Sequence, residues 1–475
     1  MKMPKCGFIS LSAACFMAGS AMATVSYTYE NDDKTLVATV TDADTALTTS
    51  AEDQAWFTAG LTNFVKRGDK ALKVWENVAN SFTGDIRIER NYLSFYANAL
   101  GINRAQGKVQ IHNGSLVHIG NKHLTVARDI EFCLGVSNDD WKGRQLEVWE
   151  GKNATVSGKV TIGNRNAYVL VYKGGTLDFT GGIEDTPGTA AGYLYVGAYG
   201  GSIITFAEKP VKLANMFYFE TPSYVYNAPD SYRDASGYVG HYIFSAPSNT
   251  VGSLGFANNS TNARLRFYDV RTTVDWAFDK SNMTVWWGND ARLDLYGTKQ
   301  RVGQFDVKVD TGNASVVTNT SATPATLYMG MIFTHGDDTI PPNIRFGGNL
   351  SVVFDNDIYK TIIDYPMTAC GNLTVAGNGR YQKSTLAFYE NGSWANATNV
   401  TVKGCGKITI ANPNALGRRA NVNLASNSSL EIASGVTVNV RTLTVGGVLQ
   451  KRGDYTFGSG TLHASQPIGC QISIR

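Results

Sequence analysis

Acidic residues gather in three short stretches of the chain. Clustered carboxylates beside a cation are what polysaccharide lyases and hydrolases use for calcium binding or for acid–base catalysis. Each stretch also contains Gly, Asn or Pro, where a carboxylate is usually a solvated turn residue. The stretches therefore predict turns, with catalysis as the alternative. They are Asn138–Asp140 with Lys142 and Arg144, His335–Asp338, and Asp355 with Asp357.

A tyrosine-rich segment from about Phe217 to Phe244 is the second group with possible chemistry. Aromatic faces beside polar groups can stack on sugar rings, so the segment predicts an inserted, ligand-binding loop. Packing of the same rings against the body of the protein is the alternative. The pair Trp286-Trp287 predicts one ring inside and one outside a strand. The candidate ligand-binding residues are Tyr224, Tyr226, Tyr232, Tyr238 and Tyr242.

Motifs for metal or nucleophile chemistry are missing from the sequence. It has six histidines, with no His-x-His or His-Glu-x-x-His, and it has no Gly-x-Ser-x-Gly elbow or phosphate loop. We therefore expect no cofactor and no bound metal, and we favour a protein that is not an enzyme.

Four cysteines remain if the N-terminal segment described below is removed, and their wide spacing does not suit a zinc site. In an oxidising compartment Cys370 and Cys405 are the best candidates for a disulfide. Small buried apolar side chains are an equal alternative. The four are Cys133, Cys370, Cys405 and Cys470.

Most of the chain has the pattern of short strands. Runs of Val, Ile, Leu, Tyr and Phe alternate with Gly, Asn, Asp and Ser. The 49 glycines against 12 prolines suit many tight corners between strands. The best helix candidate is Ala51–Phe64.

The strand pattern repeats at long intervals. Leu327, Leu350 and Leu373 lie 23 residues apart, and the double glycines at 174 and 200 lie 26 apart. A fixed period of this size predicts an all-β protein, a parallel β-solenoid in which stacked turns bury a shared core. β-Sandwich domains built from hairpins are the alternative, because Asn113-Gly114 has the sequence of a hairpin turn. Hairpins repeat every 8–12 residues, so the longer interval favours the solenoid.

The segment Phe64–Gly101 resembles the autotransporter-associated β-strand repeat. Weaker similarity continues in 292–303, 317–327 and 414–462. The resemblance implies a surface-exposed, passenger-like rod. The final residues 469–475 lack the aromatic, alternating strands of a membrane barrel, so the resemblance is to the passenger alone. The matching positions are Lys66, Gly68, Leu72, Val74, Asn80, Phe82, Gly84, Leu93 and Ala99-Leu100-Gly101.

The first 23 residues have the order of a secretory signal peptide. Lys2 and Lys5 precede a short apolar run that ends in Ala21-Met22-Ala23. Removing them takes the net charge from +3 to +1, and only 17% of residues are charged. Such a chain has no electrostatic footprint for nucleic acid, and no further segment is long enough for a transmembrane helix. We expect a signal peptide (1–23), an N-terminal cap (24–63), a solenoid (64–465) and a C-terminal tail (466–475).

Together these features predict a secreted or cell-surface β-solenoid that acts as a scaffold, an adhesin or a glycan-binding rod. The expected partners are extracellular polysaccharide or the surface of a host or neighbouring cell. The alternative is a carbohydrate-active β-helix enzyme, either a polysaccharide lyase or a glycoside hydrolase.

Overall fold

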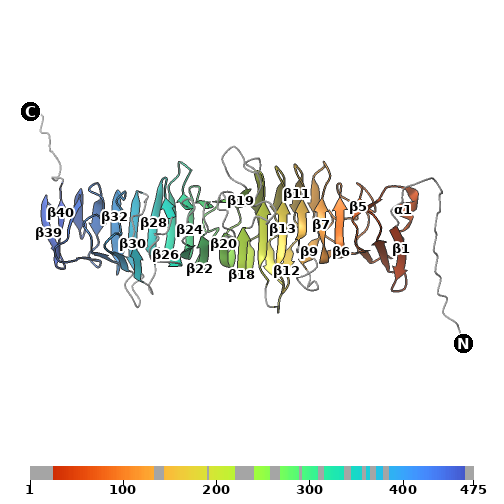
Figure 1. The fold of residues 1–475 in the computed structure, drawn as a ribbon, viewed down its shortest axis with the longest axis horizontal. Helices are drawn as coiled ribbons and strands as arrows, with labels where there is room; N and C mark the ends of the chain where they lie inside the picture. Colours follow the sequence, from red (N-terminus) through yellow and green to blue (C-terminus); the bar gives the residue numbers. More distant parts are fainter. Residues whose placement is uncertain are drawn as a thin grey trace, which may run out of the picture.

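The computed structural model describes residues 25–132, 144–189, 192–219, 240–256, 268–287, 291–308, 315–335, 344–355, 360–363, 371–377 and 385–465. The chain is nearly all β, with 58% strand and 1% helix, and forms a parallel β-solenoid of about 14 turns. Figure 1 shows a rod with the first strands at one end and the last strands at the other. The predicted solenoid is therefore confirmed.

Parallel pairing fills the body of the rod, whereas antiparallel pairing is confined, within the described residues, to its two ends. The antiparallel pairs are β1–β2, β37–β38 and β39–β40. The β-sandwich alternative is therefore wrong. The N-terminal elements are β1 (Val25–Glu30), β2 (Thr35–Val40), β3 (Thr45–Leu47), α1 (Ala51–Ala55), β4 (Asn63–Arg67) and β5 (Leu72–Val74). The C-terminal elements are β36 (Thr437–Val440), β37 (Thr442–Val445), β38 (Val448–Leu449), β39 (Gly453–Phe457) and β40 (Gly460–Ala464).

Two of the three faces of the rod belong to one 24-stranded sheet. Long strands such as β6 and β18 continue around a corner and join both faces, and β18 does so through a register shift between Leu213 and Met216. The sheet also contains the following strands: β6 (Asp85–Phe95), β7 (Lys108–His118), β9 (Asp129–Phe132), β10 (Arg144–Val148), β12 (Val160–Ile162), β13 (Ala167–Val171), β15 (Ile183–Asp185), β16 (Leu194–Ala198), β18 (Val211–Phe219), β20 (Thr250–Phe256), β22 (Asp279–Trp287), β24 (Lys299–Lys308), β26 (Ala325–His335), β28 (Leu350–Asp355), β30 (Asn372–Gly377), β32 (Asn399–Gly404) and β34 (Asn421–Leu424).

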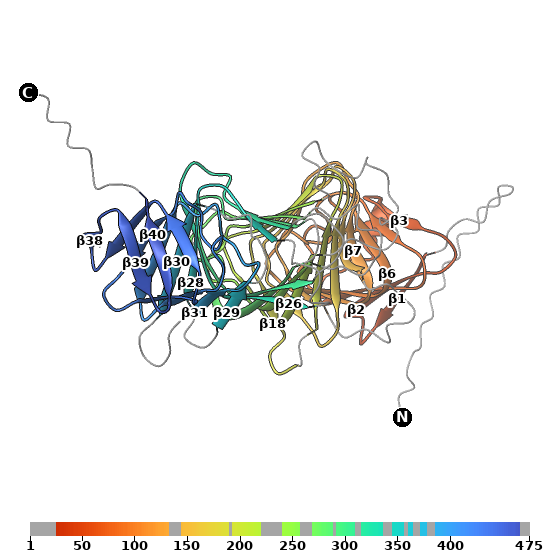
Figure 2. The same cartoon turned by 60° about the vertical axis from the view of Figure 1, so that its left-hand side comes forward.

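The third face is a nine-stranded sheet, followed toward the C-terminus by a four-stranded one. In the turn that starts at β10, the chain passes through β11 on this face and returns through β12. Figure 2 shows the strands stacked side by side along the axis. The nine strands are β8 (Leu124–Val126), β11 (Asn153–Val156), β14 (Thr176–Phe179), β17 (Ser202–Phe206), β19 (Gly240–Phe244), β21 (Tyr268–Thr272), β23 (Ala291–Asp294), β25 (Ser315–Thr318) and β27 (Ile344–Phe346), and the four are β29 (Lys360–Ile363), β31 (Thr385–Phe388), β33 (Lys407–Ile410) and β35 (Ser429–Ile432).

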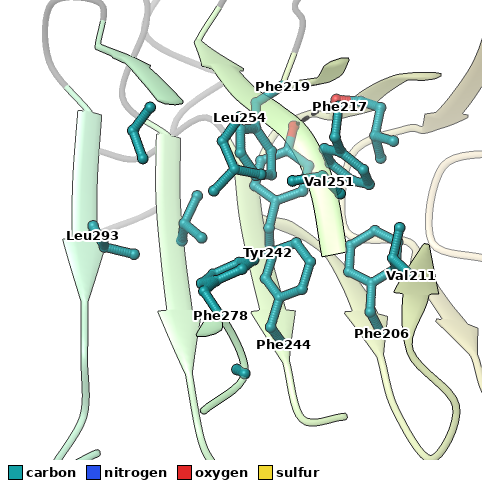
Figure 3. Packing of buried hydrophobic residues seen from close by; sticks show 14 of the residues in the cluster. Phe206, Val211, Phe217, Phe219, Tyr242, Phe244, Val251, Leu254, Phe278 and Leu293 are labelled. Atoms are coloured by element: carbon teal, nitrogen blue, oxygen red, sulfur yellow. Dashed lines mark hydrogen bonds between the residues drawn. The ribbon is translucent and has the colours of Figure 1, made fainter. Parts of the chain in front are cut away.

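Alternate residues of each strand face the axis and form one continuous hydrophobic core. Phenylalanines stack from turn to turn at the third face, with ring centroids of Phe206 and Phe244 4.8 Å apart. Figure 3 shows these rings with Phe217 and Phe278 packed around them. Each such buried side chain contributes about 1.5–3 kcal/mol relative to an exposed one. Stacking of turns therefore supplies the burial that a single turn cannot.

The three leucines of the 23-residue spacing all face this core, but their register differs from the prediction. Leu327 pairs with Val352 and Val352 with Leu373, whereas Leu350 pairs with Ala325. The turns are therefore 25 and then 21 residues long at this point, because Leu327–Val352 and Val352–Leu373 are the matched pairs. The length of a turn therefore varies along the rod. The residue equivalent to Leu327 and Leu373 is Val352, two positions after Leu350.

The Asn113-Gly114 sequence lies inside β7 and does not form a hairpin turn. Gly114 pairs with Asn91 of β6, which has a positive φ of 58°. A side chain at position 114 would overlap the carbonyl oxygen of Asn91. The glycine therefore permits a bend that runs through two neighbouring strands.

The N-terminal end is closed by β1 and by aromatic residues after α1. The helix spans only Ala51–Ala55, so the prediction of a helix to Phe64 is wrong. The chain leaves the helix because Trp56 stacks on Tyr27, at 5.0 Å between ring centroids, and Phe57 packs against Phe64. Parallel pairing already begins between β2 and β4, before residue 64.

A buried arginine joins three of the early turns. Arg128 is fully buried, and its guanidinium donates to the carbonyl oxygens of Phe82, Gly84, Leu100 and Gly101. Each of these carbonyls lies at a corner that precedes the arginine by one or two turns. A single charged side chain therefore satisfies backbone groups that the parallel ladder leaves unpaired there.

Candidate functional site

The predicted tyrosine site is only partly visible in the structure. Tyr224, Tyr226, Tyr232 and Tyr238 lie outside the described residues. Tyr242 is 0% exposed and packs among the core phenylalanines in Figure 3. Its hydroxyl donates to the carbonyl of Val196 and accepts from the amide of Ala198. Tyr242 is therefore a core residue, which corrects its assignment as a ligand contact.

The lengthened turn that the tyrosine segment predicts is present. Ile203 of β17 pairs with His241 of β19, a separation of 38 residues, compared with 27 for the preceding pair Thr176 and Ile203. The two ends of the tyrosine-rich segment are part of the solenoid, since Phe217, Phe219 and Phe244 are buried in the core. The inserted part is therefore shorter than the range from 217 to 244.

Of the predicted carboxylate stretches, little lies within the described residues. Arg144 begins β10, His335 ends β26 and Asp355 ends β28. Asp139, Asp140, Lys142, Asp337, Asp338 and Asp357 lie outside the described residues. In the described part, no three His, Cys, Asp or Glu side chains gather as metal ligands.

Of the four cysteines that follow residue 23, Cys405 is a free, half-buried thiol. The other three lie outside the described residues.

Aromatic residues follow one corner of the rod, where the face that contains β10, β13 and β16 meets the third face. The amide of Trp149 bonds to the carbonyl of His118, that of Tyr172 to Val148 and that of Tyr199 to Val171. Each residue directly follows a strand, so the same position recurs in consecutive turns. We call this line the aromatic corner, and it consists of Trp75, Tyr96, Ile119, Trp149, Tyr172 and Tyr199.

The aromatic corner is unevenly exposed. Trp75 and Trp149 are 51% and 49% exposed, whereas Tyr199 is buried. Rings of neighbouring turns touch, with centroids 5.2 Å apart for Trp75 and Tyr96 and 5.9 Å apart for Tyr172 and Tyr199. The two tryptophans are therefore the parts of this line most open to a ligand.

A hollow of about 480 Å³ opens beside the aromatic corner on the outer face of β6, β10 and β13. Its volume is in the range of sites for small molecules, about 300–1,000 Å³. The neighbouring outward positions in β6 and β7 are small, Ser94, Ser115 and Val117, which leaves room for it. The hollow is lined by Tyr92, Arg144, Glu147, Trp149, Glu150, Tyr172 and Lys173.

Glu147 is an unusual residue to find at this position. It is 2% exposed, although it points away from the core between Leu146 and Val148. Burial raises the pKa of its carboxyl group, and the hydroxyl of Tyr172 and the charge of Arg144 only partly offset this. Its Oε1 atom has no hydrogen-bond partner among the described residues. A buried carboxyl with a raised pKa beside a hollow is typical of a functional site.

Arg144 and Tyr172 hold the other carboxylate oxygen. The hydroxyl of Tyr172 donates to Oε2 of Glu147 at 2.9 Å, and it accepts from Nη1 of Arg144 at 3.1 Å. The backbone of Arg144 is in turn fixed by the hydroxyl of Ser115, which donates to its carbonyl oxygen. This chain of contacts ties the wall of the hollow to three consecutive turns.

A second group of charges lies on the outer side of the third face. Asp269 is 3% exposed and accepts from Nδ1 of His241 at 2.8 Å and from Nε of Arg292 at 2.7 Å. The three residues are register partners on β19, β21 and β23. Burial raises the pKa of Asp269, but these two hydrogen bonds outweigh it and lower the pKa to about 2. The charge of Asp269 is offset by its partners in the neighbouring strands. The three residues therefore have the features of a structural contact.

Most of the residues that line the hollow were not predicted from the sequence. Arg144 was included for its place near Asp139 and Asp140, but Glu147, Trp149 and Tyr172 were not. A signal for them exists, because an aromatic residue stands just before a glycine-containing corner in Trp149-Glu150-Gly151 and in Tyr172-Lys173-Gly174. These two tripeptides are 23 residues apart, which is one turn.

The comparisons add no relative to this picture. No family model, no curated protein and no solved structure matches the chain. Among the described residues, no helix has the length and apolar character needed to cross a membrane.

Proposed function

We propose that this protein is an exported, passenger-like β-solenoid that binds glycans through the hollow beside the aromatic corner. The observation that carries the proposal is the exposed ring of Trp149 next to Tyr172, with Arg144, Glu147 and Lys173 around the same hollow. An aromatic face stacks on the apolar face of a sugar, and charged side chains hydrogen-bond its hydroxyls. A rigid rod then carries this site as an adhesin or scaffold at the surface of a cell.

A binding experiment tests this proposal. The purified protein is applied to a glycan array, and the glycans retained are measured by titration calorimetry. Trp149→Ala is expected to weaken binding at least about tenfold, which is about 1.4 kcal/mol. Tyr296→Ala is the matched control, because Tyr296 is 45% exposed on a different part of the rod. Equal affinity of the wild-type protein and Trp149→Ala for every retained glycan would contradict the proposal.

A carbohydrate-active enzyme is the second candidate, and one observation favours it. The hollow is lined by two carboxyl groups, Glu147 and Glu150, and burial raises the pKa of the first. Glycoside hydrolases use one carboxyl with a raised pKa as an acid and a second, ionised one as a base or nucleophile. Release of reducing sugar ends by the wild-type protein and its loss in Glu147→Gln, with binding retained, would favour the enzyme.

Export is proposed from the N-terminal sequence. Residues 1–23 lie outside the described part of the chain, so the proposal rests on the order of charged, apolar and small residues there. Mass spectrometry of the mature protein is expected to find Thr24 as the first residue. An intact N-terminus in the mature protein would contradict cleavage at this position.

A further inference from the structure

We infer that the hollow is one end of a longer binding track, which runs parallel to the rod axis along the aromatic corner from Trp149 to Trp75. The ligand is then an extended, neutral polysaccharide chain that spans several turns, and not a free monosaccharide. This inference rests on the proposed function, because it extends the same site.

The geometry of the track follows from the backbone. Hydrogen bonds place Trp75, Tyr96, Ile119 and Trp149 at one position of four consecutive turns. Parallel strands lie about 4.8 Å apart, so the two tryptophans are about 14 Å apart along the axis. One compact sugar cannot contact both rings. A linear chain of sugars laid along the corner can.

The two side chains between the tryptophans, Tyr96 and Ile119, keep the track apolar. Tyr96 packs against Trp75 and is half-buried, and Ile119 is half-buried at the next turn. Gly120 follows Ile119 directly and packs so closely that a side chain there would overlap the carbonyl oxygen of Tyr96. The backbone of these turns is thus tightly nested, which holds the line of side chains rigid.

Charges along the corner are mixed in sign. Lys122 and Glu76 form an ion pair at 2.6 Å beside Trp75. Nζ of Lys152 donates to the side chain of Asn121, in the preceding turn. The ion pair and the Lys152–Asn121 contact offer donors and acceptors to hydroxyl groups without the strong positive field that a polyanion requires. A neutral, hydroxyl-rich polymer fits this surface better than an acidic one.

The test uses the full chain and a defined set of probes. Linear cello-, manno- and chito-oligosaccharides, from disaccharides to octasaccharides, are titrated into the wild-type protein by calorimetry. For the best-bound series, affinity is expected to rise at least about tenfold with length, since longer chains reach Trp75. It is expected to change less than about twofold when salt is raised from about 0.05 M to about 0.5 M, because no net charge is neutralised.

Two tryptophan variants separate the track from the site itself. Trp75→Ala is expected to remove the gain with length, so that the octasaccharide binds as weakly as the shortest bound member, whereas Trp75→Phe keeps most of the gain. A gain that persists in Trp75→Ala overturns the track but leaves the proposed function intact. Unchanged binding of short chains by Trp149→Ala overturns the proposed function, and a lack of binding across all three series overturns both. Affinity that falls steeply with salt overturns the neutral polymer.

Discussion

The guanidinium of Arg128 donates from Nη2 to the carbonyl oxygen of Phe82 at 2.7 Å, across 46 residues of sequence. The same group lies 5.5 Å from the centre of the Phe82 ring. A buried charge is tolerated at this corner because backbone carbonyl oxygens accept hydrogen bonds from it. Burial nevertheless lowers the pKa of Arg128 to about 10, which shows how far it is removed from water.

Arg128→Met is expected to destabilise the protein by about 3 kcal/mol or more. The change keeps the apolar stem but leaves several buried carbonyl oxygens without a donor. Urea unfolding, followed by circular dichroism, measures the loss. Arg104→Met is the control, because Arg104 is exposed and, within the described residues, its side chain donates to a single carbonyl, that of Asn80. Its loss is expected to cost less than about 1 kcal/mol. Equal costs for the two variants would contradict the assigned role.

His118 is expected to make the rod sensitive to mild acid. It faces the core, its Nδ1 lies 3.3 Å from the carbonyl oxygen of Phe95, and burial lowers its pKa. The unfolded chain therefore binds a proton near pH 6.5 that the folded chain does not. Stability is then lost as the pH falls below about 6.5, by at most about 1.4 kcal/mol per pH unit.

His118→Leu tests this expectation. The difference in unfolding free energy between the variant and the wild-type protein is measured from pH 7.5 to pH 5. It is expected to shift in favour of the leucine variant as the pH falls, because leucine binds no proton. A difference that stays constant over this range would show that His118 does not titrate differently in the two states.

Asp269 is also expected to make the folded state less stable in acid, but at lower pH than His118. Its pKa of about 2 lies below the ordinary value of 3.8, so the folded state favours the charged form. The resulting contribution of about 2 kcal/mol is complete above pH 5 and is lost as the pH falls through 2. Asp269→Asn should therefore be less stable than the wild-type protein at pH 6, with a gap that narrows toward pH 2.5. A gap of constant size in urea unfolding would exclude this linkage.

Gly120→Ala is expected to destabilise the rod by about 2–3 kcal/mol. The added methyl group would overlap the carbonyl oxygen of Tyr96, so two turns must move apart. Gly347→Ala is the matched control, since a Cβ there would meet only Oγ1 of Thr318 at an ordinary 3.7 Å. Thermal unfolding of both variants makes the comparison. Similar melting temperatures would show that the corner at Gly120 can relax.

The solenoid was predictable because its period is longer than that of hairpins. What single residues do within a turn was harder to predict. Tyr242 lies in a tyrosine-rich segment and was predicted to contact a ligand. Its ring instead faces the axis, because it alternates with His241 and Ile243 on β19. Only the strand register decides which of these three side chains is buried, and the long insertion before β19 hides that register in the sequence.

The hollow illustrates the other limit of sequence reasoning. Glu147 and Tyr172 are 25 residues apart and touch only because one turn stacks on the next. A varying turn length, 23 residues from β11 to β14 but 30 from β8 to β11, prevents such partners from being matched by counting. Motifs formed by residues adjacent in the sequence could be predicted. Contacts between turns could be identified only once the register of the stacked strands was known.

The antiparallel strands at both ends of the described rod have a consequence for its evolution. The interior turns all pair in parallel, so a whole turn can be gained or lost without changing the antiparallel strands at either end. Each such event would lengthen or shorten the molecule by about 4.8 Å. The distance between the two ends of the protein can therefore change only in fixed increments.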